Sequence, residues 1–302
     1  MRLSMAVFWL LLCPFQAMAA SDAPKVLASI PPLHSLAAQV MAGAGSPELL
    51  MPAFASPHDF SLKPSDAKRL GQADLVLWVG PELEGFLVKP LVGLAAKEKV
   101  LRMSGIEGMT RHQLREGGPW GGHDHGHDAH DEMDGHLWLD IGNAKKLGEA
   151  LAVKLATIDP ARATLYLENA AALSVRLDQL DADLKRDLAP LAGKPFMVHH
   201  DATQYFERRY GLNGAGSVTL NEKQPSAKSV AALRRKISDL KVRCLFKEPQ
   251  SQARLTEALA GEMHLRLGVL DDLGAGLAPG AELYERLLKG LAASFKGCLT
   301  AD

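Results

Sequence analysis

The sequence predicts an α/β protein of two lobes, each a mostly parallel sheet covered by helices, joined by one long rigid helix. Two observations support this prediction. Short apolar runs alternate with helical patterns along both halves of the 302-residue chain, and a leucine-striped helical segment separates the halves. Such alternation is typical of parallel or mixed sheets with helices on their faces. The length is sufficient for two domains of roughly 100–150 residues.

The first half contains apolar runs short enough for buried strands. The most continuous is the Leu-Val-Leu-Trp-Val run that ends at Val79, as expected for a strand buried on both faces. In chain order we expect a strand at Lys25–Ser29, a helix at Leu33–Met41, a strand at Leu49–Pro52, a helix at Ser65–Gly71 and a strand at Asp74–Val79.

The second half repeats this alternation. A weak correspondence supports a common design, because Lys63-Pro64-Ser65 before a helix in the first half parallels Gln224-Pro225-Ser226 in the second. We expect strands at Pro195–His199, Arg243–Lys247 and Arg266–Leu270, and helices at Thr203–Tyr210, Ala227–Leu240, Ser251–Gly261 and Ala281–Lys296.

The segment between the halves predicts the longest helix. Asp159 is a suitable N-cap, Pro160 fits the first helical position, and Pro190 ends the pattern. Leucines recur at intervals of three and four along one face, at Leu173, Leu177, Leu180, Leu184 and Leu188. A helix over 160–189 spans about 45 Å, so we expect a brace along both lobes. The alternative is a self-associating coiled coil, which needs more heptads with charged flanks than this segment contains.

These patterns divide the chain. We expect the N-terminal lobe at 24–142, a connecting region at 143–190 that contains the long helix, and the C-terminal lobe at 194–302. The first 19 residues predict a secretory signal peptide, because Arg2 precedes an apolar run at Met5–Cys13 and the small residues Ala17-Met18-Ala19 resemble a cleavage site. The apolar run is too short for a membrane span, which needs about 20 residues. We therefore expect an exported, periplasmic protein.

Charge and cysteine usage narrow the class further. The chain contains 34 Lys and Arg residues and 35 Asp and Glu residues. It therefore has no excess of positive charge that would favour binding to nucleic acid. Two of the three cysteines, Cys244 and Cys298, remain after removal of the signal peptide. An even count in an exported chain predicts one disulfide, which would tie the final helix to a strand of the second half. The alternative is two unpaired buried thiols.

A loop rich in histidine and carboxylates precedes the long helix. Residues 117–135 contain too few apolar side chains to build a core, and we expect this loop to be disordered. Imidazoles bind zinc, copper and nickel, although flexible ligands bind them loosely. We expect weak accessory metal capture, the alternative being a solvated linker, by His123, His125, His127 and His130.

No local motif indicates catalysis. The chain lacks a P-loop, H-E-x-x-H, G-x-S-x-G and G-x-G-x-x-G, so any site must be assembled from separated loops. Candidate residues lie where strands of an α/β sheet end, which is where such sheets bind ligands. They are His58, His136, His200 and Asp271. Their spacing carries no metal motif by itself, and a structural role is the better explanation of each histidine taken singly.

Five segments taken together resemble the zinc-binding subunit of bacterial zinc ABC importers, the ZnuA type. The resemblance runs from about residue 25 to the end of the chain. It is carried by the motifs Pro57-His58-Asp59-Phe60-Ser61-Leu62-Lys63-Pro64-Ser65-Asp66, Ala73-Asp74-Leu75-Val76-Leu77-Trp78-Val79-Gly80-Pro81-Glu82, Gly135-His136-Leu137-Trp138-Leu139-Asp140, His200-Asp201-Ala202 and Leu270-Asp271-Asp272-Leu273-Gly274.

The resemblance implies a metal site in the cleft between the lobes. The ligand positions of the family fall on His58, His136 and His200, with a carboxylate at Asp271. Three imidazoles and one oxygen suit tetrahedral Zn²⁺. The fourth position can instead belong to water or another carboxylate, and Asp272, where relatives often have proline, is one alternative.

The resemblance also implies a monomeric periplasmic receptor that delivers Zn²⁺ to an ABC permease in the inner membrane, with a separate ATPase. Nucleic acid, small organic substrates and enzymatic activity are not expected. Two alternatives stay open, a zinc hydrolase with a three-histidine site and a metal-binding adhesin or storage protein. Around the site we expect His199 and His264 to be structural, and the carboxylates that could orient imidazoles are Asp59, Asp201 and Glu248.

Overall fold

The computed structural model describes residues 22–94, 97–115, 120, 133–219 and 225–300. The expected signal peptide, and the loop histidines His123, His125, His127 and His130, lie outside the described residues. Within the described part of the chain, no helix is both long and apolar enough to cross a membrane.

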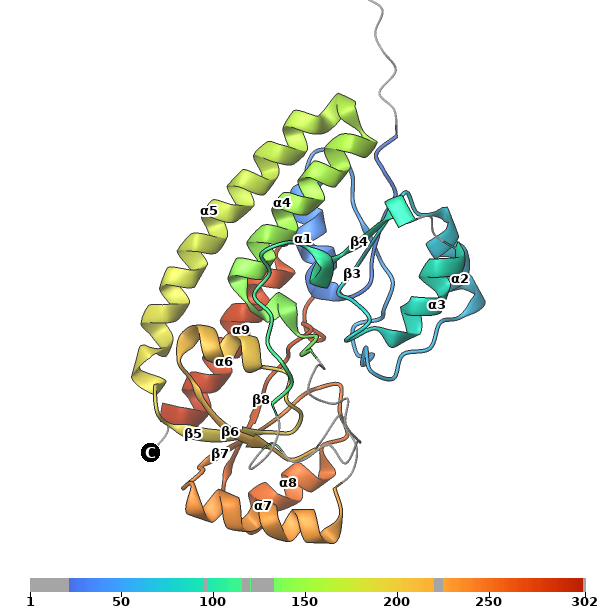
Figure 1. Cartoon of the computed structure of the whole chain (residues 1–302). Coiled ribbons are helices and arrows are strands. Elements are labelled where there is room, and N and C mark those ends of the chain that lie inside the picture. Colours follow the sequence, from blue (N-terminus) through green and yellow to red (C-terminus); the bar gives the residue numbers. More distant parts are fainter. Residues whose placement is uncertain (1–21, 95–96, 116–119, 121–132, 220–224, 301–302) are drawn as a thin grey trace, which may run out of the picture.

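Two four-stranded parallel sheets form the cores of two lobes (Figure 1). The N-terminal sheet has the order β2-β1-β3-β4 and the C-terminal sheet the order β6-β5-β7-β8, so the two lobes share one topology. The strands of the first sheet are β1 (Val26–Ala28), β2 (Glu48–Leu49), β3 (Leu75–Trp78) and β4 (Val100–Arg102). Those of the second are β5 (Pro195–Val198), β6 (Asn213–Ser217), β7 (Cys244–Lys247) and β8 (Arg266–Val269).

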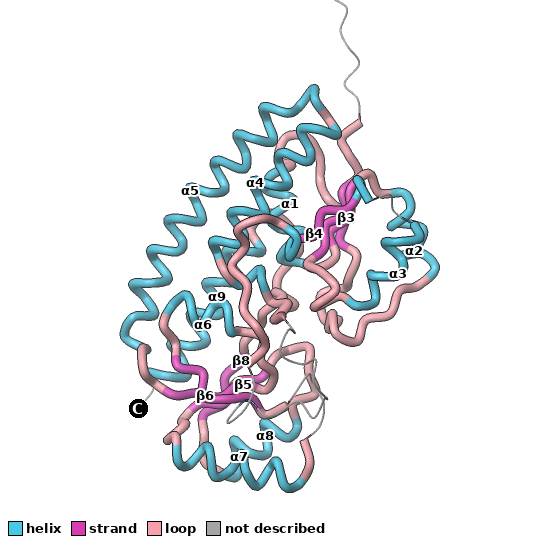
Figure 2. Tube along the Cα trace, in the orientation of Figure 1, coloured by secondary structure: helices cyan, strands magenta, loops and turns pink. Residues whose placement is uncertain are grey.

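Helices cover the sheets and link the lobes, as Figure 2 shows. The helices of the first half are α1 (Pro31–Val40), α2 (Pro64–Gln72), α3 (Gly85–Leu94) and α4 (Ile141–Ile158). Those that follow are α5 (Ala163–Leu188), α6 (Gln204–Tyr210), α7 (Ala227–Asp239), α8 (Arg254–Glu262) and α9 (Leu283–Thr300). The predicted α/β class and the predicted long helix are confirmed.

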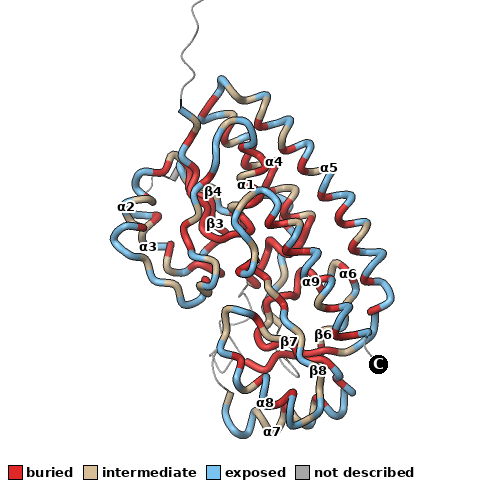
Figure 3. Tube along the Cα trace, turned by 180° about the vertical axis from the view of Figure 1, so that it is seen from behind, coloured by how far each residue is buried: buried red, intermediate tan, exposed pale blue. Residues whose placement is uncertain are grey.

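Helix α5 is the long helix that was predicted to run along both lobes, and it is called the brace helix below. Its 26 residues contact α1 and α4 of the first lobe and α6 and α9 of the second, and it runs along the side of the molecule past both lobes (Figure 1). Its leucine stripe is buried while its outer face is exposed (Figure 3). Burial of such a stripe is the main source of stability for a helix in water.

The start of the brace differs from the prediction. Asp159 does not cap the helix: a 3-10 turn, Pro160–Arg162, intervenes, and α5 begins at Ala163. The Asp159 carboxylate instead accepts hydrogen bonds from the Arg162 guanidinium, at 2.6 Å, and the Tyr166 hydroxyl, at 2.8 Å. The Asp159 carboxylate therefore pairs with the side chains of Arg162 and Tyr166 instead of capping α5.

Four regular elements were not predicted, and the first of them is helix α3 (Gly85–Leu94). Helix α4 packs along α5, and its N-cap is Asp140, which accepts a hydrogen bond from the Asn143 amide at 2.9 Å. Strand β4 and strand β6 complete the two sheets. The sequence of β6, Asn-Gly-Ala-Gly-Ser, has no strand propensity, and its pairing with β5 depends on the tertiary context.

The predicted disulfide is confirmed. Cys244 on β7 and Cys298 on α9 are bonded, with Cα atoms 6.0 Å apart. Both cysteines are buried. The bond holds the last helix against the second sheet, as expected.

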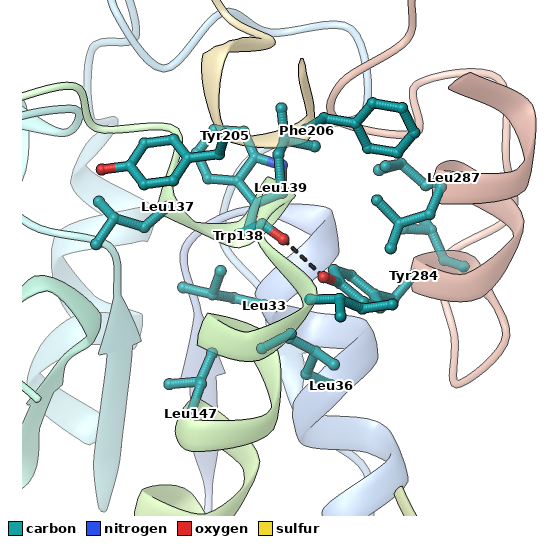
Figure 4. Close-up of a cluster of buried hydrophobic side chains, with 14 of the residues drawn as sticks. Leu33, Leu36, Leu137, Trp138, Leu139, Leu147, Tyr205, Phe206, Tyr284 and Leu287 are labelled. Carbon is teal, nitrogen blue, oxygen red and sulfur yellow. Dashed lines mark hydrogen bonds between the residues drawn. The ribbon is translucent and has the colours of Figure 1, made fainter. Parts of the chain in front are cut away.

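A continuous apolar core joins the lobes at a short 3-10 turn, Leu137–Leu139, in which all three residues are buried. Figure 4 shows this turn packed among side chains of α1, α4, α6 and α9. The Tyr284 hydroxyl of α9 donates a hydrogen bond to the Trp138 carbonyl at 2.7 Å. Because this turn directly follows His136, the core fixes the backbone on which that imidazole stands.

Candidate metal centre

The structure brings three of the predicted ligands together. His58, His136 and His200 each offer a ring nitrogen, and these atoms all lie within 4.8 Å of one another. The ring centroids are 5.6 Å apart for His58 and His136, 5.0 Å for His58 and His200, and 5.1 Å for His136 and His200. Three imidazoles at such spacing surround a volume of the size of a metal ion.

Each imidazole comes from a different segment of the chain. His58 lies in the loop after β2, where the Ser56 hydroxyl accepts its backbone N–H at 3.2 Å. His200 follows β5, and its backbone N–H donates to Glu248 Oε1 at 3.3 Å. Since His58 belongs to the N-terminal lobe and His200 to the C-terminal lobe, the cluster lies between the lobes.

His136 is held by a buried carboxylate that sequence reasoning missed. Asp134 Oδ1 lies 2.7 Å from His136 Nδ1 and also accepts the His136 backbone N–H at 2.9 Å. Asp134 is fully buried. A carboxylate on one ring nitrogen fixes the tautomer and leaves the other nitrogen, Nε2, for a metal. The signal was a carboxylate two residues before the histidine, inside a tract in which many carboxylates look alike.

The segment before His136 is ordered further back than expected. Met133 pairs with Gln113 in an isolated bridge, and the Asp134 backbone N–H donates to the His112 carbonyl at 2.9 Å. The Tyr205 hydroxyl of α6 donates to the Asp134 carbonyl at 3.0 Å. Residues 133–135 are therefore part of the site's framework rather than of a loose loop.

The electrostatics differ among the three imidazoles. Loss of hydration lowers the pKa of His58 to about 4 although the residue remains partly exposed, and the neighbouring His136 adds to the shift. Burial together with the other two imidazoles holds the pKa of His200 well below its usual value. Burial also acts to lower the pKa of His136, but the Asp134 carboxylate outweighs it and raises that pKa. These shifts favour the neutral forms of His58 and His200, and Asp134 favours the protonated form of His136.

Asp271 is not brought to the imidazoles. Its Oδ1 accepts the backbone N–H groups of Gly274 and Ala275, at 2.8 and 2.9 Å, and its Oδ2 accepts that of Gly276 at 3.0 Å. The pocket at the cluster is lined by a different set of side chains. Besides the three histidines they are Ser56, Pro57, Glu248, Gln250, Asp272 and Leu273.

The other residues near the site divide by role. Glu248 supports the backbone of His200, as expected for a carboxylate that orients a ligand. Asp201 instead pairs with Arg115, whose Nε lies 2.9 Å from its Oδ2, while Arg115 Nη1 lies 2.6 Å from Glu207. Asp59 is exposed. Arg115 thus connects the segment after β4 to the second lobe.

Neither of the two histidines expected to be structural belongs to the cluster. His199 Nδ1 is 2.7 Å from the Thr256 hydroxyl, on the side of α8. His264 is exposed just after α8, with a left-handed backbone at φ 54°.

Comparison with known proteins gives one consistent family. The family described as "Zinc-uptake complex component A periplasmic", ZnuA, matches residues 26–298. The chain is 39% identical over 93% of each chain to the high-affinity zinc uptake system protein ZnuA of Brucella suis. It is 35% identical over 91% of each chain to the protein of that name from Yersinia pestis.

Solved structures share the fold. A crystal structure of ZnuA superposes with a TM-score of 0.80 at 24% identity, covering 92% of this chain and 100% of that one. The periplasmic zinc binding protein TroA from Treponema pallidum gives a TM-score of 0.79 at 24% identity, covering 92% and 99%. With the family match spanning both lobes and all three clustered histidines, the chain belongs to the ZnuA family of periplasmic zinc-uptake components.

Proposed function

We propose that this protein captures Zn²⁺ in the periplasm and delivers it to an ABC permease of the inner membrane that is powered by a separate ATPase. The observation that supports the proposal is the convergence of His58, His136 and His200 from three distant segments onto one small pocket. The sequence relationship to zinc uptake proteins of the same length supports the transport role.

The donor set suits zinc. Neutral imidazoles bind Zn²⁺ at about 2.0–2.1 Å, and three of them with one oxygen complete a tetrahedral site. Mg²⁺ and Ca²⁺ prefer sites built from oxygen ligands. Copper and nickel also bind imidazole, and copper does so more strongly than zinc, so preference for zinc depends on geometry and on the metals present.

Capture involves little movement of the lobes. Arg209 of α6 donates to Asp181 of α5 at 2.6 Å and lies 3.1 Å from Asp140 at the start of α4. This clamp fixes the brace helix to both lobes, and Arg115 adds a second link between them. We propose that release comes from movement of the loop that carries His58 rather than from a wide hinge.

We propose that the receptor acts as a monomer, is exported by the N-terminal signal sequence, and binds its cargo without chemical change. A three-histidine zinc site with an open position can also activate water. Metal-loaded protein is therefore expected to show no turnover of ester, amide or phosphate probes above that of a His58→Ala, His136→Ala, His200→Ala variant. Turnover that depends on these histidines would identify a hydrolase instead.

A zinc titration tests the binding function. Mature protein stripped with a chelator is expected to bind one tight equivalent of Zn²⁺ in competition with a chromophoric chelator. The variant with all three histidines replaced by alanine is expected to lose that equivalent while retaining its circular dichroism spectrum. Survival of the tight equivalent in this variant would place the site elsewhere.

The pH dependence of binding follows from the charge on the cluster. The lowered pKa values of His58 and His200 favour their neutral, metal-binding forms, whereas the raised pKa of His136 favours its protonated form. Zinc must displace this proton, so affinity is expected to fall by about tenfold per pH unit below the pKa of His136. The slope is expected to steepen only near pH 4, where His58 takes up its own proton.

Calorimetry in two buffers of different ionisation enthalpy measures this proton release. About one proton per zinc is expected near pH 6.5. Release of up to three protons per zinc as the pH is lowered through 6 would show that the three imidazoles titrate as ordinary, independent groups. That result would contradict the role assigned to Asp134.

A further inference from the structure

We propose that Arg115 is a positioning residue for His200, and that residues 112–115 set the separation between His200 and His136. This inference rests on the proposed zinc-binding function. It assigns a role in ligand geometry to a side chain that lies outside the group of three imidazoles.

The Arg115 guanidinium makes paired contacts with two carboxylates. Its Nε lies 2.9 Å from Asp201 Oδ2, and its Nη2 pairs with Asp201 Oδ1. Its Nη1 lies 2.6 Å from Glu207 Oε2, and its Nη2 lies 3.2 Å from Glu207 Oε1. The Trp120 ring covers the guanidinium, with the ring centroid 3.5 Å from Cζ. The planar fork of arginine suits this arrangement, and the compact ammonium of lysine cannot reproduce it.

The second lobe fixes the Glu207 end of this pairing. Glu207 lies on α6 and is 1% exposed, and its Oε1 accepts a hydrogen bond from the Thr203 hydroxyl at 2.7 Å. Gly214 of β6 leaves the space that the pair needs, because a Cβ there would lie 3.2 Å from Arg115 Nη1 and closer still to the Glu207 carboxylate. The guanidinium is therefore held against α6 and β6, and it holds Asp201 in turn.

His200 depends on support of this kind, because its hydrogen bonds to the described part of the chain are made by its backbone. Its N–H donates to Glu248 Oε1 at 3.3 Å, and its carbonyl accepts the Ala202 N–H at 3.0 Å. His136, by contrast, has a carboxylate directly on its ring. The His200 ring therefore takes its position from the turn between β5 and α6, and Asp201, the next residue, ties that turn to the first lobe.

The segment that carries Arg115 also supports the other ligand. The His112 carbonyl accepts the Asp134 backbone N–H at 2.9 Å, and Asp134 holds the ring of His136. Residues 112–115 thus support His136 from one end and His200 from the other. The two ring centroids are 5.1 Å apart, and a change in this segment would alter that separation.

Charge and position predict opposite effects of Arg115 on zinc. A cation near the site repels Zn²⁺, so removal of a residue that acted through its charge alone would strengthen zinc binding. Removal of a positioning residue instead releases the turn that carries His200, and zinc binding weakens. Loss of a group that orients a metal ligand costs about 10- to 100-fold in affinity, and we expect a loss of this size in Arg115→Met.

Three variants test the inference: Arg115→Met, Arg115→Lys and, as a control, Arg162→Lys. Arg115→Lys keeps the charge and loses the fork, and Arg162→Lys makes the same exchange in the ion pair with Asp159 just before α5. Zinc affinity is measured by chelator competition, and ligand geometry by the visible absorption of the Co²⁺-loaded protein. Arg115→Met is expected to lower zinc affinity and shift the Co²⁺ bands, and Arg115→Lys to do both to a smaller extent. Arg162→Lys is expected to change neither.

The outcomes separate position from charge and from stability. Unchanged or tighter zinc binding in Arg115→Met would overturn the positioning role. Weaker binding with unchanged Co²⁺ bands would overturn it too, because the ligands would then have kept their geometry. Should Arg115→Met fail to fold, Arg115→Lys decides, since an unchanged affinity or unchanged bands in that variant would contradict the inference. A tight zinc equivalent that is lacking in the unaltered protein would instead contradict the proposed function itself.

Discussion

Replacement of His136 by alanine is expected to weaken zinc binding by about a thousandfold, which corresponds to about 4 kcal/mol. The loss is large because this imidazole is both a ligand and the group whose orientation is most completely fixed. Asp134 holds one ring nitrogen at 2.7 Å, and the next three residues are buried in the core between the lobes. Removing the ring also leaves the buried Asp134 carboxylate without its partner.

Two further variants make this measurement specific. Asp134→Asn keeps the His136 ring but weakens its support, and its expected effect is a smaller loss of about 10- to 100-fold. His264→Asn removes an exposed imidazole at a left-handed position that asparagine tolerates, and it is expected to leave zinc affinity unchanged. An effect of His136→Ala as small as that of His264→Asn, measured by chelator competition, would show that His136 does not bind the ion.

Loss of the disulfide is expected to lower the free energy of unfolding by about 4 kcal/mol on the chain-entropy model of a cross-linked unfolded state. The two cysteines are 54 residues apart in sequence, so the bond restricts a long loop. The double variant Cys244→Ser, Cys298→Ser avoids leaving one free thiol. Denaturant unfolding with and without reductant provides the measurement, and the double variant should not respond to reductant.

The same variant also separates stability from binding. The bond joins β7 to α9, whereas the three imidazoles form a cluster between the lobes. At a temperature where the reduced protein is still folded, one tight zinc equivalent is expected to remain. A loss of stability well below 1 kcal/mol would show that packing around α9, rather than the cross-link, holds this helix.

The architecture was predictable where the sequence carries a strong periodic signal. The apolar run of β3 and the leucine stripe of α5 lie where the patterns placed them. Strand β6 was not predictable, because glycines give no local preference and only pairing with β5 makes the segment a strand. Helix α4 was predictable in principle, since Asp140 is a good N-cap before an apolar stripe.

The candidate site was predictable in part. His58, His136 and His200 were recognised through motifs rather than through spacing, because residues so distant in sequence converge only when the chain is folded. The orientation of Asp271 was beyond the sequence, because three backbone amides of the following turn decide which way its carboxylate faces. Asp134 was missed because nothing local distinguishes a buried carboxylate from its acidic neighbours.

The Arg209 clamp has a consequence for recognition by any downstream partner. Because one guanidinium pins α4, α5 and α6 together, we expect loaded and unloaded receptor to share nearly the same outline. The changes that we expect on loading are local: a divalent ion enters beside His136, and the loop that carries His58 loses freedom. A transporter that accepts only loaded receptor must therefore sense the electrostatic potential and the rigidity of the surface around the metal site. A change in the overall shape of the receptor would not distinguish the two states.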